Sequence, residues 1–231
     1  MPFFYLDYWY IVLVVPALLL AFWAQINVNT TFSRYSKVTA PSGMTGAESA
    51  RRVLEANGVT GVRIERISGN LTDHFDPKTN TIRLSESVYD ATTVSAVGVA
   101  AHEAGHAVQY AVGYSPMKLR AAIIPATNIG SQLAMPLVLL GLLLSSAMLV
   151  DIGIVAFSMS TLFQLVTLPV EFNASRRAVA TLDASCVSAA EVKGAKAVLR
   201  AAALTYVAAL AVSLASLLRL ILLFGGRNRR D

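Results

Sequence analysis

Apolar residues gather in four long runs along the chain, at about residues 8–26, 121–146, 150–168 and 198–224. Each run is close to or above the roughly 20 residues that an α-helix needs to cross about 30 Å of hydrocarbon. Aromatic side chains mark both ends of the first run, as they do at membrane–water interfaces: Tyr8, Trp9, Tyr10 and Trp23. The pattern predicts an all-α membrane protein with about four transmembrane helices, the second and third joined by a tight turn.

The first run is also compatible with a secretory signal peptide. No basic residue precedes its apolar stretch, and no clear small-residue cleavage site follows it. We therefore expect residues 8–26 to remain as an anchor.

Two polar segments, residues 27–118 and 169–196, lie between the spans. In the first, residues 62–67 alternate apolar and polar side chains, which predicts a half-buried strand. Residues 71–75 and 81–84 flank a run of turn-forming residues and predict a hairpin. A small α+β insertion with about three strands is expected here.

Two helices are predicted in the same insertion. Thr45, with Glu48 three residues later, matches an N-terminal capping box, and Gly58 is placed to end that helix. The second helix is expected over about residues 91–112, with Gly113 as its C-terminal stop.

The composition supports a membrane location. The chain has 231 residues, of which 55% are hydrophobic and 14% charged, and its mean hydropathy is +0.57. Ordinary soluble domains carry about 25% charged residues. The lone Cys186 excludes an intramolecular disulfide and is compatible with a reducing cytoplasm.

Most of the 19 Lys and Arg residues lie in the two polar segments. By the positive-inside rule both segments face the cytoplasm and the N-terminus lies outside. Four spans return the C-terminus to the outside, which conflicts with the basic residues at 227–230. Arg200 and Arg219 stand near the ends of the fourth run, where long side chains can reach the interface. Topology and anionic lipid headgroups account for the net charge of +5, so we expect no nucleic-acid binding.

The candidate chemistry lies in the predicted helix 91–112, which contains the sequence His102-Glu103-Ala104-Gly105-His106. Two imidazoles at i and i+4 share one helix face and can reach a single metal ion. Zinc held in this way keeps a position open for water and lowers its pKa to about 7, and Glu103 lies where it can take the water's proton. The pattern predicts a catalytic zincin-like site; a buried histidine pair without metal is the alternative.

A third protein ligand must come from elsewhere in the chain. Glu171 is the preferred candidate, because it follows Pro169 at an expected helix start and emerges where the third span reaches the cytoplasm. The alternative role for Glu171 is a carboxylate that interacts with the positive end of that helix. Asp183 and Glu191 are reserve candidates for the ligand.

His74 is the remaining histidine, and it lies on the predicted hairpin. It is a candidate catalytic residue, as a donor to the oxyanion of the tetrahedral intermediate or as a contact to the substrate. The alternatives are a turn histidine hydrogen-bonded to Asp76 and, as a minor possibility, a metal ligand. Many metalloproteases bind extended substrates along an edge strand beside the metal, and this hairpin could serve in that way.

These stretches together resemble one known family. The motif at 102–106, the segments at 73–77 and 84–85, and the segment at 168–176 are similar to those of the YugP-like bacterial membrane zinc metallopeptidases. The resemblance covers most of the chain. It implies an endopeptidase of the bacterial inner membrane whose zinc site faces the cytoplasm.

A more distant similarity links the chain to the HtpX-type and CAAX-prenyl proteases, which pair such a helix with a later Glu-x-x-x-Asp. Ser175 stands where that Asp would be. In the wider group the Asp orients a zinc-binding histidine, so here Asn173, Ser175 or Asp183 is expected to take its place.

The sequence thus predicts a single membrane-embedded domain over residues 1–231 that holds Zn²⁺ through His102, His106 and Glu171 and hydrolyses peptides or membrane-protein segments. Glu103 acts as general base and then as general acid. The main alternative is a zinc-binding membrane chaperone or scaffold whose metal is structural. A transporter or lipid-handling protein is less favoured, because few charges lie within the spans. The oligomeric state is left open.

Overall fold

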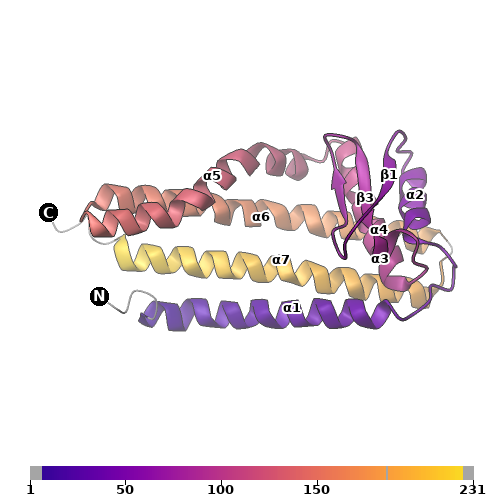
Figure 1. Ribbon diagram of the computed structural model, residues 1–231, viewed down its shortest axis with the longest axis horizontal. Helices are drawn as coiled ribbons and strands as arrows, with labels where there is room; N and C mark the ends of the chain where they lie inside the picture. The colour runs from indigo at the N-terminus through magenta and orange to yellow at the C-terminus, as the bar shows by residue number, and fades with distance from the viewer. Residues whose placement is uncertain (1–6, 186, 226–231) are drawn as a thin grey trace. The chain divides into compact units, whose positions relative to one another are not determined.

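The computed structural model describes residues 7–185 and 187–225, so Cys186 and the basic residues at 227–230 lie outside the described part of the chain. The elements follow one another as η1 Tyr10–Val14, α1 Val15–Tyr35, α2 Gly46–Ala56, β1 Arg63–Ile67, β2 His74–Asp76, β3 Thr81–Ser85, α3 Glu86–Tyr89, α4 Val94–Ala111, α5 Ser115–Leu143, α6 Ala147–Ala184 and α7 Ala189–Phe224 (Figure 1).

The chain divides into two compact units, which are described separately. The helical unit comprises residues 1–24, 119–168 and 205–231, and the mixed unit comprises residues 25–118 and 169–204. The polar segments expected at 27–118 and 169–196 fall within the mixed unit. Helices α1, α6 and α7 contribute residues to both units.

The four predicted membrane-spanning helices are confirmed by length and composition. They are Tyr10–Tyr35, Ser115–Leu143, Ala147–Ala184 and Ala189–Phe224. Three of them extend well beyond the predicted runs. An apolar run marks the part of a helix that suits hydrocarbon, whereas the helical backbone can continue past the end of that run. The third is the most extended, at 38 residues.

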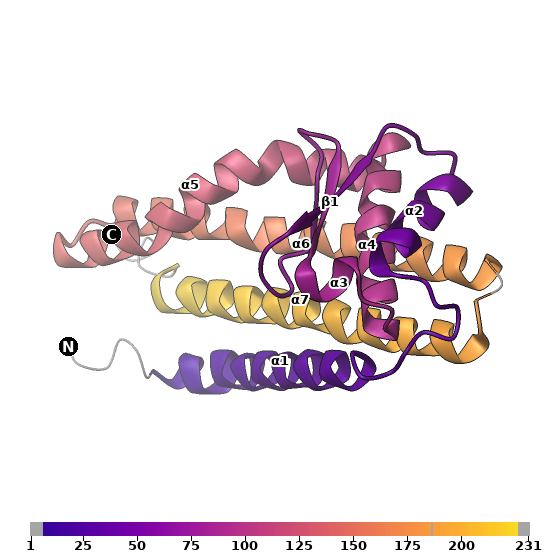
Figure 2. The same ribbon diagram turned by 45° about the vertical axis from the view of Figure 1, so that its right-hand side comes forward.

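Small residues bring the helices of the helical unit close together. A Cβ on Gly130 would lie 2.8 Å from the carbonyl oxygen of Ala156, and one on Gly153 would lie 2.9 Å from that of Ala134. Small residues at such contacts are typical of transmembrane helix packing. In both ribbon views α5 runs beside α6 and α7 beside α1 within this unit (Figure 2).

An ion pair joins the start of the first span to the end of the last. Arg219 Nε donates a hydrogen bond of 2.8 Å to Asp7 Oδ2, and the guanidinium lies 5.2 Å from the ring centroid of Tyr10. A carboxylate and an aromatic face therefore surround the Arg219 guanidinium at this end of the spans. The expectation that this side chain can reach the lipid interface stays a prediction.

The mixed unit contains a three-stranded sheet in the order β1-β3-β2, so that β2 is an edge strand. β2 and β3 are antiparallel and form the predicted hairpin, whereas β1 pairs with β3 in parallel. The turn is held by Asp76, which accepts hydrogen bonds from the Lys78 backbone N–H (3.0 Å) and the Thr79 hydroxyl (2.7 Å). The central strand is buried, with Ile82 and Leu84 fully covered.

The predicted helices of this unit are also present. In α2 the Thr45 and Glu48 side chains form the full capping box with each other's backbone N–H. α4 begins after the N-cap Thr93 and ends before Gly113, whose φ of 66° is the left-handed conformation that suits glycine. The Ser49 hydroxyl donates to the Val97 carbonyl at 2.9 Å and ties α2 to α4 inside the core.

The expected helix start at Pro169 is wrong, because Pro169 lies inside α6. A proline within a helix removes one backbone hydrogen bond and usually costs about 3 kcal/mol. On both sides of the proline, however, the buried positions follow every four residues without interruption: Val166, Val170, Ala174, Ala178 and Leu182. Burial of this stripe favours a continuous helix over a break.

α4 and α6 approach closely at Gly105, and we expect Gly105→Ala to destabilise the protein. A Cβ there would lie 2.6 Å from the carbonyl oxygen of Ala174, a backbone atom that cannot rotate away. Overpacking costs about 1–3 kcal/mol, against the roughly 1 kcal/mol that alanine gains over glycine in a helix. The control is Gly98→Ala, where the nearest atoms of Ala195 lie at 3.3 Å. In thermal melts in detergent, Gly105→Ala should melt at a lower temperature than both the wild type and Gly98→Ala; an unchanged melting temperature would contradict this packing.

Candidate metal centre

The site begins with the two histidines of α4. His102 and His106 stand one turn apart, and their ring centroids are 4.6 Å apart at an interplanar angle of 79°. The opposite side of α4 is packed into the core through Val97, Ala101, Ala104 and Val108, all fully buried. That packing fixes the face on which the imidazoles stand.

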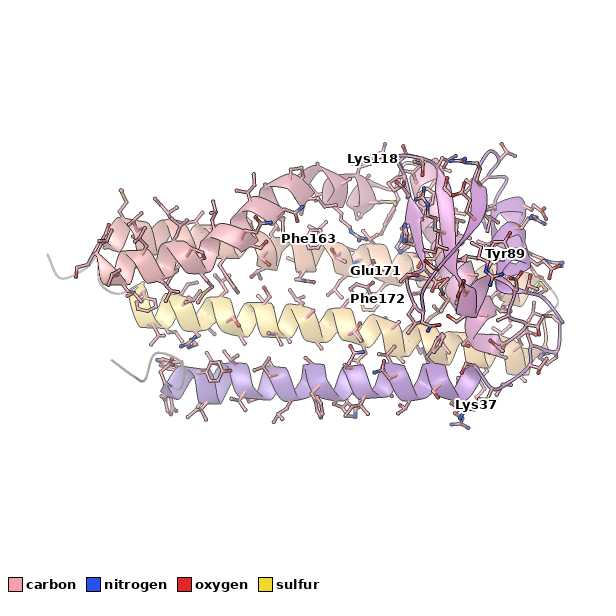
Figure 3. All side chains as sticks on the ribbon, viewed as in Figure 1. Lys37, Tyr89, Lys118, Phe163, Glu171 and Phe172 are labelled. Carbon is pink, nitrogen blue, oxygen red and sulfur yellow. The ribbon has the colours of Figure 1, made fainter. Side chains whose placement is uncertain are left out.

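Glu171 on α6 completes a group of three. Its Oε2 atom lies 3.2 Å from His102 Nε2 and 3.5 Å from His106 Nε2, and the ligand atoms of the three residues all lie within 4.8 Å of one another. Glu171 is 2% exposed, and Figure 3 shows it on α6 next to Phe172. With Glu171 in mid-helix, its alternative role at a helix N-terminus is excluded.

These separations fit a zinc ion. Tetrahedral zinc with ligands at about 2.0–2.1 Å places neighbouring ligand atoms about 3.3 Å apart, close to the two distances between Glu171 and the histidines. Two imidazole nitrogens and one carboxylate oxygen are also a donor set that zinc prefers. The residues present therefore fit this metal.

The outer nitrogen of each imidazole has a hydrogen-bond partner. His102 Nδ1 lies 3.1 Å from Ser175 Oγ, and His106 Nδ1 lies 3.0 Å from Gln109 Oε1. Such contacts hold a ring in place and direct its Nε2 toward the metal. Of the three candidates for the partner of His102, Ser175 is the one in contact.

Gln109 was missed in the sequence. It is fully buried, and its Nε2 donates to the Val170 carbonyl (2.8 Å) and to Asn173 Oδ1 (3.0 Å) on α6. The available signal was a single amide three residues after His106 in an apolar stretch of helix, a spacing that puts both side chains on one face.

Glu103 is half-buried beside the histidines. Within residues 7–185 and 187–225 its carboxylate has no hydrogen-bond or ion-pair partner. A carboxylate that is not committed to a permanent partner can exchange a proton, as a general base must.

The other predicted site residues lie elsewhere. His74 on the edge strand β2 is exposed, lies outside the three-residue group, and donates from Nδ1 to the Thr72 carbonyl at 2.8 Å rather than bonding to Asp76. The Glu191 carboxylate accepts hydrogen bonds from the Ser42 backbone N–H and hydroxyl at 3.0 and 2.7 Å, which excludes it as the reserve ligand. Asp183 is exposed on α6 and also lies outside the group.

The electrostatics of the site favour positive charge near His106. Burial alone lowers the pKa of His106, but the hydrogen bond to Glu171 and the negative charges of Glu103 and Glu171 outweigh it and raise the pKa above 6.5. A cation is therefore stabilised at this position, whether it is a proton or a metal ion.

The comparisons with known proteins agree with this geometry. A family described as "Putative neutral zinc metallopeptidase" matches residues 10–225. The chain belongs to this family. It is 49% identical over 223 residues to a Bacillus subtilis (strain 168) protein described as "Putative membrane protease YugP", covering 96% of this chain and 98% of that relative. No solved structure matches the chain.

Membership of this zinc metallopeptidase family supports the predicted class of protein, a membrane hydrolase that uses zinc. The group formed by His102, His106 and Glu171 is where a metal fits in the described part of the chain.

The pKa of His106 predicts how the stability of the metal-free protein depends on pH. Because the folded pKa is raised above 6.5, the pairing stabilises the fold below that value and is lost as pH rises through the raised pKa. The melting temperature of the metal-free protein should therefore fall as the pH rises above about 6.5. Glu171→Gln should flatten this decline; a flat profile in the wild type would contradict the prediction.

Proposed function

We propose that the chain is a membrane-bound zinc-dependent endopeptidase in which His102, His106 and Glu171 hold Zn²⁺. The observation that carries the proposal is the convergence of three ligand atoms from two helices at separations that suit tetrahedral zinc. Among residues 7–185 and 187–225 three protein ligands converge, and His102 and Glu103 are half-buried rather than sealed. This arrangement suits a catalytic site, which keeps one position for water or substrate.

Glu103 carries the proton in the proposed reaction. Zinc, when bound, acts as a Lewis acid and lowers the pKa of water to about 7. The Glu103 carboxylate takes a proton from the attacking water as the C–O bond forms at the peptide carbonyl. It then gives that proton to the departing amine as the C–N bond breaks, which restores the carboxylate.

The edge strand beside α4 supports a peptide substrate. β2 contacts α4, and the Phe75 ring on β2 lies 5.8 Å from the Tyr110 ring on α4, one turn beyond His106. An extended peptide can add to the free edge of β2 through backbone hydrogen bonds and present its side chains to these rings.

His74 has a place in this proposal as a substrate contact on β2. Its Nδ1–H is engaged by the Thr72 carbonyl, so the neutral ring has only an acceptor at Nε2. A donor to the oxyanion would need a second proton on the ring. We therefore retain the contact role of His74 and give less weight to the oxyanion role.

We further propose that the protein lies in the bacterial inner membrane, with the mixed unit in the cytoplasm and lipid around the spans. The bacterial relative is described as a membrane protease, and the basic residues of the two polar segments favour the cytoplasmic side. Substrates would then be peptides or membrane-protein segments. The same charges give no reason to propose nucleic-acid binding.

The alternative is a zinc-binding chaperone or scaffold. Structural zinc sites fill all four positions with protein ligands, whereas three converge among the residues that the structure describes. The Glu103 carboxylate, which has no side-chain partner among the described residues, has an obvious role only in the catalytic proposal.

Two variants distinguish the zinc endopeptidase from the zinc-binding scaffold. Glu103→Gln should bind about one zinc per chain like the wild type, but lose cleavage of denatured membrane proteins by roughly 10²–10⁴-fold, because an amide cannot take the proton. Glu171→Ala should lose both cleavage and zinc binding. Zinc content is measured on protein purified in detergent. Full cleavage by Glu103→Gln would refute the mechanism; zinc binding without cleavage by any form, including wild type, would favour the scaffold.

The proposed orientation can be tested by labelling. In a Cys186→Ser background, Lys78→Cys on the exposed hairpin turn and Leu144→Cys at the exposed end of α5 should report opposite faces. In whole bacterial cells with the outer membrane permeabilised, a membrane-impermeant maleimide should label Leu144→Cys only. In inverted vesicles it should label Lys78→Cys only, and the reverse pattern would overturn the cytoplasmic placement.

A further inference from the structure

A line of hydrogen bonds runs from His106 on α4 to Arg177 on α6, within the mixed unit. His106 Nδ1 meets Gln109 Oε1 at 3.0 Å, and Gln109 Nε2 meets Asn173 Oδ1 at 3.0 Å. Arg177 Nε donates to the same Asn173 oxygen at 2.8 Å. Gln109 Nε2 also donates to the Val170 carbonyl at 2.8 Å.

The chemistry of these groups determines which atom donates and which accepts in each of these hydrogen bonds. A guanidinium can only donate, so Asn173 must turn its oxygen toward Arg177. The same oxygen faces Gln109, and the Val170 carbonyl is a second acceptor there, so Gln109 must present its amide nitrogen. Its oxygen then faces His106.

An amide oxygen can only accept, so it requires the proton of His106 to be on Nδ1. Nε2 is left with a lone pair directed at the metal centre, 3.5 Å from the Glu171 oxygen. In this way the charge on Arg177 selects the ligand-competent tautomer of His106 through two intervening amides.

We propose that Gln109, oriented by Asn173 and Arg177, is a positioning residue that fixes the tautomer and ring orientation of His106 for zinc binding. The proposal rests on the assignment of His106 as a zinc ligand. It accounts for the full burial of the Gln109 amide. If the role of this residue were purely structural, an apolar side chain of equal size could replace it.

The two histidines are therefore controlled differently. Ser175, the partner of His102, has a hydroxyl that can rotate and either donate or accept, so it holds the ring without selecting a tautomer. We expect Ser175→Ala to weaken zinc binding less than loss of the Gln109 amide does.

The test is a series of variants whose zinc affinity is measured by chelator competition, with cobalt(II) absorption as a second readout of the ligand geometry. Gln109→Leu should weaken zinc binding by about 10–100-fold, the usual loss when the partner of a ligating histidine is removed. Arg177→Leu should weaken it by about threefold, since it acts through further hydrogen bonds. The matched control is Arg176→Leu, because Arg176 is an exposed neighbour outside the line.

A double variant separates positioning from packing. Gln109→Glu keeps an acceptor for His106 but places a carboxylate oxygen against the Val170 carbonyl and against the Asn173 oxygen, which Arg177 prevents from turning away. Adding Arg177→Leu frees Asn173 to turn and donate, so the double variant should bind zinc more tightly than Gln109→Glu alone and restore part of the cobalt spectrum. Residues with merely structural roles would show additive losses instead.

Each outcome has a definite meaning. If wild type binds no zinc, the proposed function fails. If wild type binds zinc but Arg177→Leu matches Arg176→Leu, or the double variant is the weaker, the positioning role is overturned while the proposed function stands. Thermal melts of the metal-free variants identify any that do not fold. If Gln109→Leu does not fold, the comparison of Arg177→Leu with Arg176→Leu still decides whether the positioning role stands.

Discussion

The buried carboxylate of Glu171 is the constraint on which the mixed unit depends. A carboxylate that is 2% exposed is costly unless positive charge or hydrogen-bond donors surround it. Two of its partners are imidazoles of one helix, so α4 and α6 must be in close contact at this level. Gly105 permits that contact by leaving room for the Ala174 carbonyl. Zinc would replace this ion pairing with metal coordination and leave the helix packing unchanged.

Much of this architecture was predictable because its signals are local. Apolar runs of sufficient length, the capping box at Thr45 and the turn residues after Asp76 each act over a few residues, and the structure contains the elements they predict. The pairing of His102 and His106 also follows from helical spacing alone. The convergence of Glu171 with them was anticipated, although for a partly wrong reason.

The errors arose where packing overrides a local signal. Pro169 normally suggests a helix start, but the buried stripe from Val166 to Leu182 carries the helix through it. The pairing of Arg219 with Asp7, 212 positions away in sequence, is likewise a contact that a single sequence does not reveal. Gln109 was overlooked because its importance lies in contacts with α6, which a single sequence does not reveal. The side of the membrane on which the site lies stays a prediction.

X-ray absorption at the zinc edge of the purified protein would test directly whether two imidazoles and one carboxylate hold the zinc. We expect only nitrogen and oxygen ligands at about 2.0–2.1 Å, a coordination number of four or five, and the multiple-scattering signature of about two imidazoles. A sulfur ligand at about 2.3 Å, or a shell without imidazole, would contradict this ligand set.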